Sequence, residues 1–254
     1  MQLSLRLEAI AGMVSEGNRL VDVGCDHGYL PVYLVQEKKI PKAIAMDVRE
    51  GPLSRAREHI SQYGLDQYIE TRLSDGLQAL KEGEGDTLVI AGMGGPLMER
   101  ILTEGELVRE SFSELILQPQ SDIPHFRRFI REAGWEIVEE ELILEDGKFY
   151  PMMKAEKGKA LPLPPYTEQE LRFGRLLLKE RHPVLLKYLL RELRLCREIQ
   201  EKLGTAPKEN ARKRQEEVKE DEQQILAALQ LYEDYRIDGL SGDTLSGEGS
   251  RGLG

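Results

Sequence analysis

Short apolar runs alternate with amphipathic helical patterns over the first 160 residues, and this alternation constrains the fold more than any other feature. The apolar runs are RLVDVG, KAIAMDV, YIETRLSDG, DTLVIAGMGG, ELILQPQ and WEIVEEELIL. Helical stretches such as PLSRAREHISQYG and HFRRFIREAG lie between them. Six strands separated by helices form βαβ units, so the pattern predicts a parallel or mostly parallel, doubly wound α/β sheet. Such sheets bind ligands at the carboxyl ends of their strands.

The pattern changes at KGKALPLPPY, residues 157–166. This proline-rich segment is typical of a linker, and it predicts a first domain over residues 1–158. Leucines at helical spacing then run from Leu171 to Leu203. A second domain is therefore expected over residues 159–236.

The second domain is expected to be a helical hairpin. Its first helical run breaks at GTAP, residues 204–207, and a second run covers about Lys208 to Arg236. Two long helices joined by a short turn predict an antiparallel, coiled-coil-like pair. The Gly/Ser-rich residues 237–254 are expected to form a flexible tail.

Charge is distributed unevenly along the chain. The net charge is -10, yet residues 171–219 carry 14 Lys and Arg against 7 Asp and Glu. A basic helical arm on an acidic body is typical of a protein that contacts nucleic-acid phosphates, although solubility alone can also enrich exposed helices in Lys and Arg. The N-terminal Arg6 is a further candidate phosphate contact. The candidates within the arm are Arg172, Arg175, Lys179, Arg181, Lys187, Arg191 and Arg194.

Several classes of protein are disfavoured. No apolar run approaches the roughly 20 residues of a membrane helix. The N-terminal MQLSLRLEAIAGMV has Glu8 inside its apolar stripe, which predicts a surface helix rather than a signal peptide. The two cysteines, Cys25 and Cys196, lie far apart and predict a reducing cytoplasm without a disulfide framework. No metal site is expected, because Cys25 and His27 lack companions at ligand spacing.

A glycine turn, GCDHGYLP at residues 24–31, follows the first buried strand and leads into a helix. Gly24 and Gly28 would let the backbone approach a ligand at the helix N-terminus. The G-x-x-x-G spacing differs from the dinucleotide pattern G-x-G-x-x-G. Taken alone, the turn fits either a dinucleotide or S-adenosylmethionine.

Acidic residues at successive strand ends favour S-adenosylmethionine. Asp47 ends the second strand, where a carboxylate can accept hydrogen bonds from both ribose hydroxyls, a device that NAD enzymes share. Asp75 ends the third strand, where it can accept from an adenine amino group. The alternative for Asp22 and Asp75 is that they cap helices or turns. The predicted cofactor-binding residues are Asp22, Gly24, Asp26, His27, Gly28, Asp47, Val48, Asp75, Gly76, Gly92 and Met93.

The fourth strand ends in AGMGG, residues 91–95. In doubly wound methyltransferases this strand end faces the transferred methyl group, so Gly94 and Gly95 are predicted to line the substrate pocket. Enzymes that methylate exocyclic adenine nitrogens commonly carry an Asn-Pro-Pro-aromatic loop here, and this sequence has none. The loop therefore counts against exocyclic amino-group chemistry.

A family resemblance rests on five segments together with the helical hairpin. These segments are LSLRLEAIA at residues 3–11, DVGCDHGYLP at 22–31, DGL at 75–77, AGMGG at 91–95 and LILQP at 115–119. In this combination the chain resembles the bacterial tRNA (adenine-22-N1)-methyltransferase family. Three departures from the family pattern are Cys25 for Ser, Gly28 for Ala, and Gln120 where Asn is common.

The resemblance implies a Rossmann-like class I methyltransferase with a C-terminal coiled-coil domain. Its reaction would move a methyl group from S-adenosylmethionine to N1 of adenine in the D-arm region of tRNA, with the base splayed out of the folded RNA. Asp26 is the candidate catalytic carboxylate for the cationic product. His27 could orient Asp26 or contact the cofactor, or could simply cap a helix or pack. Tyr29 could stack on a base or fill core space.

Two other functions remain open from the sequence. One is a class I methyltransferase that acts on a small molecule or a protein, with the hairpin as an element for homodimerisation. The other is a non-catalytic nucleotide-binding module whose coiled coil recruits partners.

Overall fold

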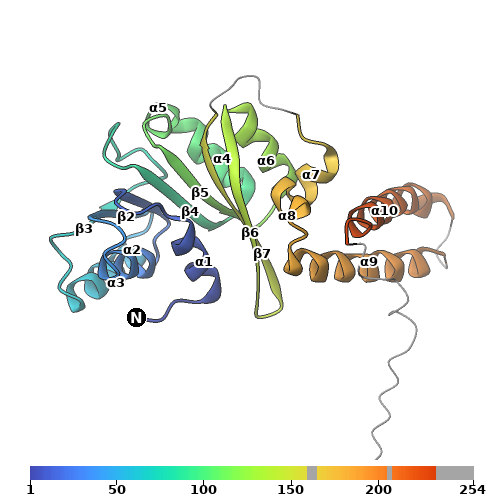
Figure 1. Cartoon of the computed structure of the whole chain (residues 1–254), viewed down its shortest axis with the longest axis horizontal. Helices are drawn as coiled ribbons and strands as arrows, with labels where there is room; N and C mark the ends of the chain where they lie inside the picture. The colour runs from blue at the N-terminus through green and yellow to red at the C-terminus, as the bar shows by residue number, and fades with distance from the viewer. Residues whose placement is uncertain (159–164, 205–207, 233–254) are drawn as a thin grey trace, which may run out of the picture. The chain divides into compact units, whose positions relative to one another are not determined.

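The computed structural model describes residues 1–158, 165–204 and 208–232. Two compact units make up the chain, Met1–Tyr188 and Leu189–Gly254. The first unit holds the sheet. The second holds most of the last two helices that the structure describes (Figure 1). Within the described residues, no helix is long and apolar enough to cross a membrane.

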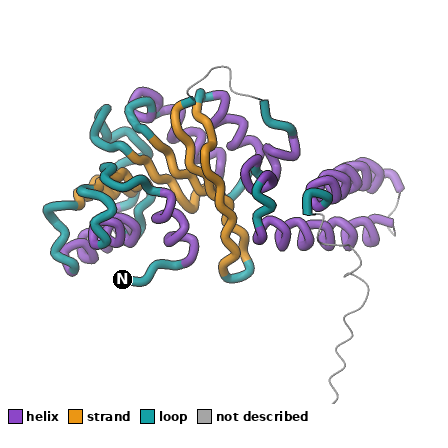
Figure 2. The backbone as a smooth tube through the Cα atoms, viewed as in Figure 1, coloured by secondary structure: helices purple, strands orange, loops and turns teal. Residues whose placement is uncertain are grey.

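A seven-stranded sheet forms the centre of the first unit (Figure 2). Its spatial order is β3-β2-β1-β4-β5-β7-β6. The first five strands are parallel, and β7 is antiparallel to both of its neighbours. The strand order reverses between β1 and β4, which places the ligand crevice of a doubly wound fold at their carboxyl ends. The strands are β1 Leu20–Val23, β2 Ala43–Asp47, β3 Ile69–Leu73, β4 Thr87–Met93, β5 Glu114–Pro119, β6 Trp135–Glu145 and β7 Lys148–Lys157.

Helices cover both faces of this sheet, which explains why β1, β2 and β5 are buried along their whole length. Successive side chains point to opposite faces, so Leu20 joins one core cluster and Val21 joins the other. The first cluster packs under α1 Leu5–Met13, α2 Tyr29–Gln36 and α3 Glu50–Gln62. The second packs under α4 Gly95–Glu104, α5 Glu106–Arg109 and α6 Ile123–Glu132.

Helix α1 is tied to the two last strands of the sheet. The Leu5 N–H donates to Glu145 Oε1 at 2.6 Å, and Lys154 Nζ donates to the Met13 carbonyl oxygen at 3.0 Å. Lys154 also pairs with the buried Glu114 on β5, at 2.8 Å. The N-terminal helix therefore depends on contacts with residues about 140 positions further along the chain.

Strand β7 was missing from the sequence prediction, which gave six strands. Its sequence, KFYPMMKAEK, contains a proline and lacks the regular alternation of a half-buried strand. It pairs with β5 on one side and β6 on the other, and its central residues Met152–Ala155 are buried. The predicted mostly parallel, doubly wound sheet is confirmed, with an antiparallel pair at one edge.

The leucine run that predicted one long helix is broken into three. These are α7 Glu168–Phe173, α8 Arg175–Lys179 and α9 Pro183–Gly204. Gly174 has φ +93 and Arg181 has φ +52, so both residues leave the helical conformation. Leucine spacing alone did not reveal these breaks.

The first compact unit also extends beyond the predicted boundary at residue 158, because α7 and α8 belong to it. Arg127 on α6 donates to the carbonyl oxygens of Leu171 and Arg172, at 2.8 and 3.2 Å. Glu140 on β6 accepts from the Leu176 N–H at 2.9 Å and from Arg127 Nε at 2.8 Å. This buried ion pair fixes both short helices to the sheet domain. Residues 159–164 of the predicted linker lie outside the described residues.

In the second unit, α9 pairs with α10 Lys208–Leu229 (Figure 1). Glu222 accepts from Arg197 Nε at 3.2 Å and from Gln200 Nε2 at 2.7 Å. Apolar side chains from both helices are buried, among them Leu193 and Ile225. The predicted hairpin is confirmed as a pair of helices, but α10 ends at Leu229 rather than Arg236. The predicted tail, residues 237–254, lies outside the described residues.

Candidate active site

The turn from β1 to α2 is shaped by residues with positive φ. Gly24 has φ +80, Asp26 has φ +48 and Gly28 has φ +67. The N–H groups of Gly24 and Cys25 donate to the Met46 carbonyl oxygen, which ties the turn to the end of β2. Within the part of the chain that the structure describes, no side-chain hydrogen bond caps the N-terminus of α2. Its first N–H groups therefore remain available to a ligand at this strand end.

Asp22 and Asp47 lie at the carboxyl ends of β1 and β2, and both are buried. One Asp47 oxygen accepts from the Arg49 N–H at 2.9 Å. Among the described residues, the Asp22 carboxyl has no hydrogen-bond partner. Burial, with a smaller contribution from the charge of Asp47, raises the pKa of Asp22 to about 7. Two buried carboxyl groups with free accepting capacity thus lie close enough to interact, near the carboxyl ends of adjacent strands.

Burial also raises the pKa of Cys25, and the Asp22 and Asp47 charges add to the effect. The side chain therefore stays a neutral thiol near pH 7 and is a poor nucleophile and metal ligand. No group of three or more metal-ligating side chains occurs among the residues that the structure describes.

Asp75 and Val48 line a shared hollow of about 340 Å³, together with Leu73, Ser74, Gln78 and Ala79. The exposed side chains of Val48 and Leu73 give it apolar walls. The Asp75 carboxylate is held by Arg100 of α4, with Oδ1 2.9 Å from Nη2. An open hollow that combines apolar side chains with a carboxylate suits a flat base that carries an amino group.

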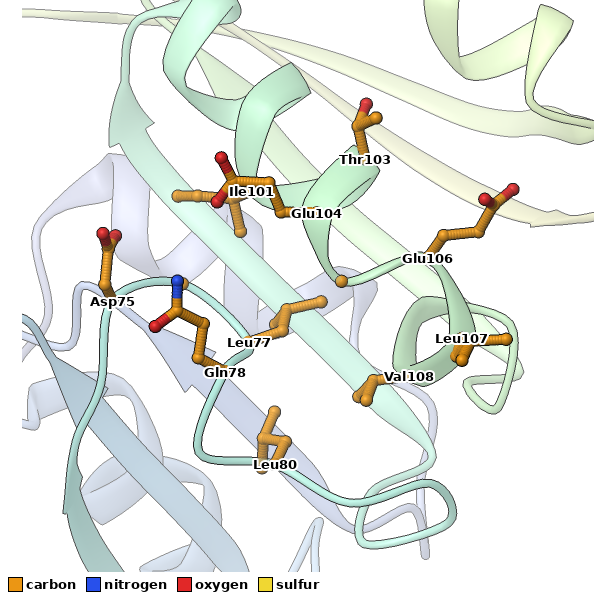
Figure 3. A pocket seen from close by; sticks show the side chains of 12 residues that line it. Asp75, Leu77, Gln78, Leu80, Ile101, Thr103, Glu104, Glu106, Leu107 and Val108 are labelled. Carbon is orange, nitrogen blue, oxygen red and sulfur yellow. The ribbon is translucent and has the colours of Figure 1, made fainter.

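A second cavity, of about 430 Å³, lies between the loop that follows β3 and the helices α4 and α5 (Figure 3). Asp75 stands at its rim, Leu77 and Leu80 line it from the loop, and Ile101 and Val108 line it from α4 and α5. Asp22, Gly24 and Asp47 do not line this cavity. We therefore do not assign the cofactor to this cavity, although it is larger than the hollow beside Val48.

The end of β4 is open and glycine-rich, and Arg6 lies against it. Gly92 has φ +79, and the ladder with β5 is irregular between Ala91 and Met93. Gln118 Oε1 accepts from both the Gly92 N–H and Arg6 Nη1, each at 3.1 Å. A Cβ at Gly92 would stand 3.2 Å from Arg6 Nη1. Arg6, predicted from the sequence as a phosphate contact, is thus positioned at the predicted substrate pocket.

Two further glycines follow at this strand end. A Cβ at Gly95 would stand 2.6 Å from the Ser121 carbonyl oxygen, so only glycine fits there. At Gly94 the nearest atom is the Ser121 hydroxyl oxygen, at 3.0 Å. Gln118 is a site residue that sequence reasoning missed. Its signal is a polar residue within the apolar run LILQP, and it is fully buried.

Asp26 and His27 are close but not hydrogen-bonded to each other. His27 Nε2 lies 3.7 Å from Asp26 Oδ2, and Arg55 Nη2 lies 3.5 Å from Asp26 Oδ1. The Asp26 side chain is exposed and that of His27 is 35% exposed. Tyr29 is 42% exposed, so it does not fill core space.

The candidate phosphate contacts fall into two groups. Arg172 and Arg175 lie on α7 and α8 in the first unit, where Arg175 pairs with Glu170 at 2.8 Å and stacks over Tyr166. Arg172 lies over the Phe173 ring. These two side chains already stabilise the fold. The remaining candidates, Lys179, Arg181, Lys187, Arg191 and Arg194, are exposed.

Comparison with known proteins places this arrangement in a family. A methyltransferase domain family matches residues 3–153. The tRNA (adenine(22)-N(1))-methyltransferase of Bacillus subtilis is 35% identical over 210 residues, which cover 81% of this chain and 87% of that protein. The chain belongs to the tRNA (adenine(22)-N(1))-methyltransferase family. The resemblance carried by the five sequence segments is thereby confirmed.

Solved structures of tRNA (adenine(22)-N(1))-methyltransferases share this fold. The crystal structure of the B. subtilis m1A22 tRNA methyltransferase TrmK has a TM-score of 0.78 and 32% identity, and covers 90% of this chain and 99% of that one. Streptococcus pneumoniae Sp1610, crystallised with S-adenosyl-L-methionine, has a TM-score of 0.78 and 36% identity. The match covers 90% of this chain and 100% of that one.

Proposed function

We propose that this chain transfers a methyl group from S-adenosylmethionine to N1 of adenine 22 in tRNA. The observation that carries the proposal is the convergence of Asp22, Asp47 and Asp75 at the strand ends of a chain in this family. The B. subtilis relative is named for this reaction. The cytoplasm is the compartment that the cysteine usage favours.

The residues at these strand ends support the cofactor assignment through their chemistry. Asp47 keeps one carboxylate oxygen for the ribose hydroxyls, since only its other oxygen is bonded to Arg49. The hollow beside Val48 and Asp75 offers apolar side chains and a carboxylate acceptor, which would suit the adenine ring. Asp22 would face the cationic end of the cofactor, whose charge a carboxylate stabilises. Gly24 and Gly28 would let the backbone approach the ligand.

The chemistry requires positioning more than acid–base catalysis. Bound S-adenosylmethionine would supply a methyl group already activated by its sulfonium, so the protein has to orient adenine N1 in line and exclude water. Gly92, Gly94 and Gly95 leave room for the base, and Arg6, fixed by Gln118, would contact the target nucleotide. Asp26 would stabilise the positive charge that methylation places on the ring.

Mass spectrometry of nucleosides tests the proposed reaction. Incubation of the protein with S-adenosylmethionine and total bacterial tRNA is expected to yield 1-methyladenosine, mapped to position 22. Methylation of an exocyclic nitrogen, or transfer of the methyl group only to protein or to small molecules, would contradict the proposal.

Cofactor affinity is expected to rise with pH up to about 7 and then to level off. Because the pKa of Asp22 is raised to about 7, lower pH leaves it protonated and removes a negative charge that the cationic cofactor needs. Titration calorimetry should show Kd falling by up to about tenfold between pH 6 and pH 8. The Asp22→Asn variant should give a flat profile. A wild-type profile that is equally flat would rule out this role for Asp22.

The same pKa shift affects stability with the opposite sign. The unfolded chain releases the Asp22 proton near pH 4, whereas the folded chain holds it until about pH 7. Between these pH values, ionisation of the carboxyl lowers the free energy of the unfolded state relative to the native state. This carboxyl therefore destabilises the free protein as pH rises. Ionisation of Asp22 thus lowers the stability of the free protein and raises its affinity for the cofactor.

The hairpin is proposed to contact tRNA phosphates rather than a second chain. The pairing of α9 with α10 buries apolar side chains of both helices within one chain. Lys187 and Arg194 remain exposed. The double variant Lys187→Gln, Arg194→Gln is expected to weaken tRNA binding and to lower the slope of log K against log salt by about 1 to 2. Lys42→Gln, an exposed residue just before β2, is the control and should leave the slope unchanged.

A further inference from the structure

Four aromatic rings form a continuous row beside the cofactor turn. His27 stacks on Tyr29 with ring centroids 5.3 Å apart and planes 20° apart. Tyr29 meets the edge of His59 at 4.8 Å, and His59 meets Tyr63 at 5.0 Å. These separations are those of attractive ring pairs. The rings come from the β1–α2 turn, the first residue of α2, the C-terminal part of α3 and Tyr63, the residue that follows α3.

The ring row is held in place by the backbone beneath it. His59 Nδ1 lies 3.1 Å from the His27 carbonyl oxygen, within hydrogen-bond distance, which links α3 to the turn. Gly28 lies against Ala56 of α3, where an added Cβ would stand 3.3 Å from the Ala56 Cβ. This close approach fits glycine and brings α2 and α3 together. The row is therefore ordered in advance of any ligand, which lowers the entropic cost of binding.

Core packing does not explain the ring row. Tyr29 is 42% exposed and Tyr63 is 39% exposed. Neither tyrosine belongs to the two clusters of core side chains found among the described residues. Arg55, also on α3, lies 3.5 Å from Asp26, the residue that precedes His27. Two exposed tyrosines next to two half-buried histidines, with a guanidinium nearby, are typical of surfaces that stack on unpaired nucleobases.

We propose that the row of His27, Tyr29, His59 and Tyr63 is a stacking platform for an unpaired base of the tRNA next to the target adenine. This rests on the proposed function. Extraction of the target base leaves its neighbours without a stacking partner, and a protein ring replaces that partner. The platform accepts any base, because every base presents a π-face.

Tyr63 provides the sharpest test, because it lies at the far end of the row and is not among the residues assigned to the cofactor. Tyr63→Ala is expected to raise the Kd for tRNA by about 5- to 100-fold, the usual effect of removing one base-stacking ring. Tyr63→Phe should bind within about twofold of the wild type, because it keeps the ring. Neither variant should change the Kd for S-adenosylmethionine. The control is Tyr68→Ala, an exposed tyrosine just before β3 that is outside the row.

A spectroscopic measurement separates stacking from a structural effect. In tRNA with 2-aminopurine next to position 22, binding to the wild type and to Tyr63→Phe should change the fluorescence of the label, and Tyr63→Ala should lose that change. Equal losses in the Ala and Phe variants, or unchanged tRNA affinity in Tyr63→Ala, would overturn the platform. So would a dimer that Tyr63→Ala converts to a monomer, since the row would then be a contact between two copies. Failure of the proposed function is a different result, in which the wild type methylates no tRNA.

Discussion

Replacing Arg127 with methionine is expected to lower the free energy of unfolding by about 3 to 5 kcal/mol. Arg127 Nε lies 2.8 Å from Glu140 Oε1, and the two side chains are 1% and 0% exposed. Without the guanidinium, the Glu140 carboxylate would be left buried without its counter-charge. The carbonyl oxygens of Leu171 and Arg172 would also lose a donor. Urea unfolding curves with an unchanged slope would measure the loss.

The next residue on α6 is a matched control. Arg128 also pairs with a glutamate, Glu168 at 2.8 Å, but its side chain is 44% exposed. Arg128→Met should therefore cost no more than about 1 kcal/mol. The double variant Arg127→Met, Glu140→Leu should recover much of the stability, because it removes both charges from the interior. A loss in Arg127→Met no greater than that in Arg128→Met would mean that the buried pair is not what holds α7 and α8.

The second large effect is expected at Asp47. Asp47→Ala should weaken S-adenosylmethionine binding by about 1 to 3 kcal/mol, or roughly 5- to 150-fold in Kd, because the ribose hydroxyls would lose their acceptor inside a buried site. Asp47→Asn keeps an acceptor for the Arg49 N–H, so a weakening in this variant cannot come from a loosened turn. Isothermal titration calorimetry measures both.

Two further results complete the Asp47 experiment. Asp66→Asn, an exposed acid ahead of β3, should bind the cofactor as tightly as the wild type does. In Asp47→Asn the pH profile of cofactor binding should shift to lower pH, because the Asp47 charge helps to raise the pKa of Asp22. Undiminished affinity in both Asp47 variants would show that the ribose lies elsewhere.

The parallel part of the fold could be predicted from the sequence because its strands are buried on both faces and read as apolar runs. The same reasoning failed at β7, where Pro151 and a mixture of charged and apolar residues obscure the strand. It also failed at Gly174, which interrupts a run of leucines that would otherwise suit one helix. The packing that requires glycine there is tertiary, since a Cβ would stand 2.7 Å from Glu140 Oε1.

The candidate site was predictable to the extent that its residues follow strands in sequence. Asp22, Gly24, Asp47 and Asp75 lie at strand ends as expected, and their roles in binding stay predictions. The hydrogen bond between Arg6 on α1 and Gln118 on β5 joins residues 112 positions apart in the sequence. No local pattern encodes that contact. The row of rings was hidden for the same reason, because α3 brings His59 and Tyr63 to the turn only after folding.

The attachment of α1 to β6 and β7 also determines when the N-terminal helix can complete its folding during synthesis of the chain. A ribosome adding about 5 to 20 residues per second needs roughly 7 to 30 s to produce the 140 residues between Leu5 and Glu145. During that interval α1 can pack on the first core cluster but lacks its native contacts with β6 and β7. Contacts of such long sequence separation also slow folding. The enzyme is therefore expected to acquire its Arg6 contact, and with it a complete substrate pocket, only once its last two strands have been made.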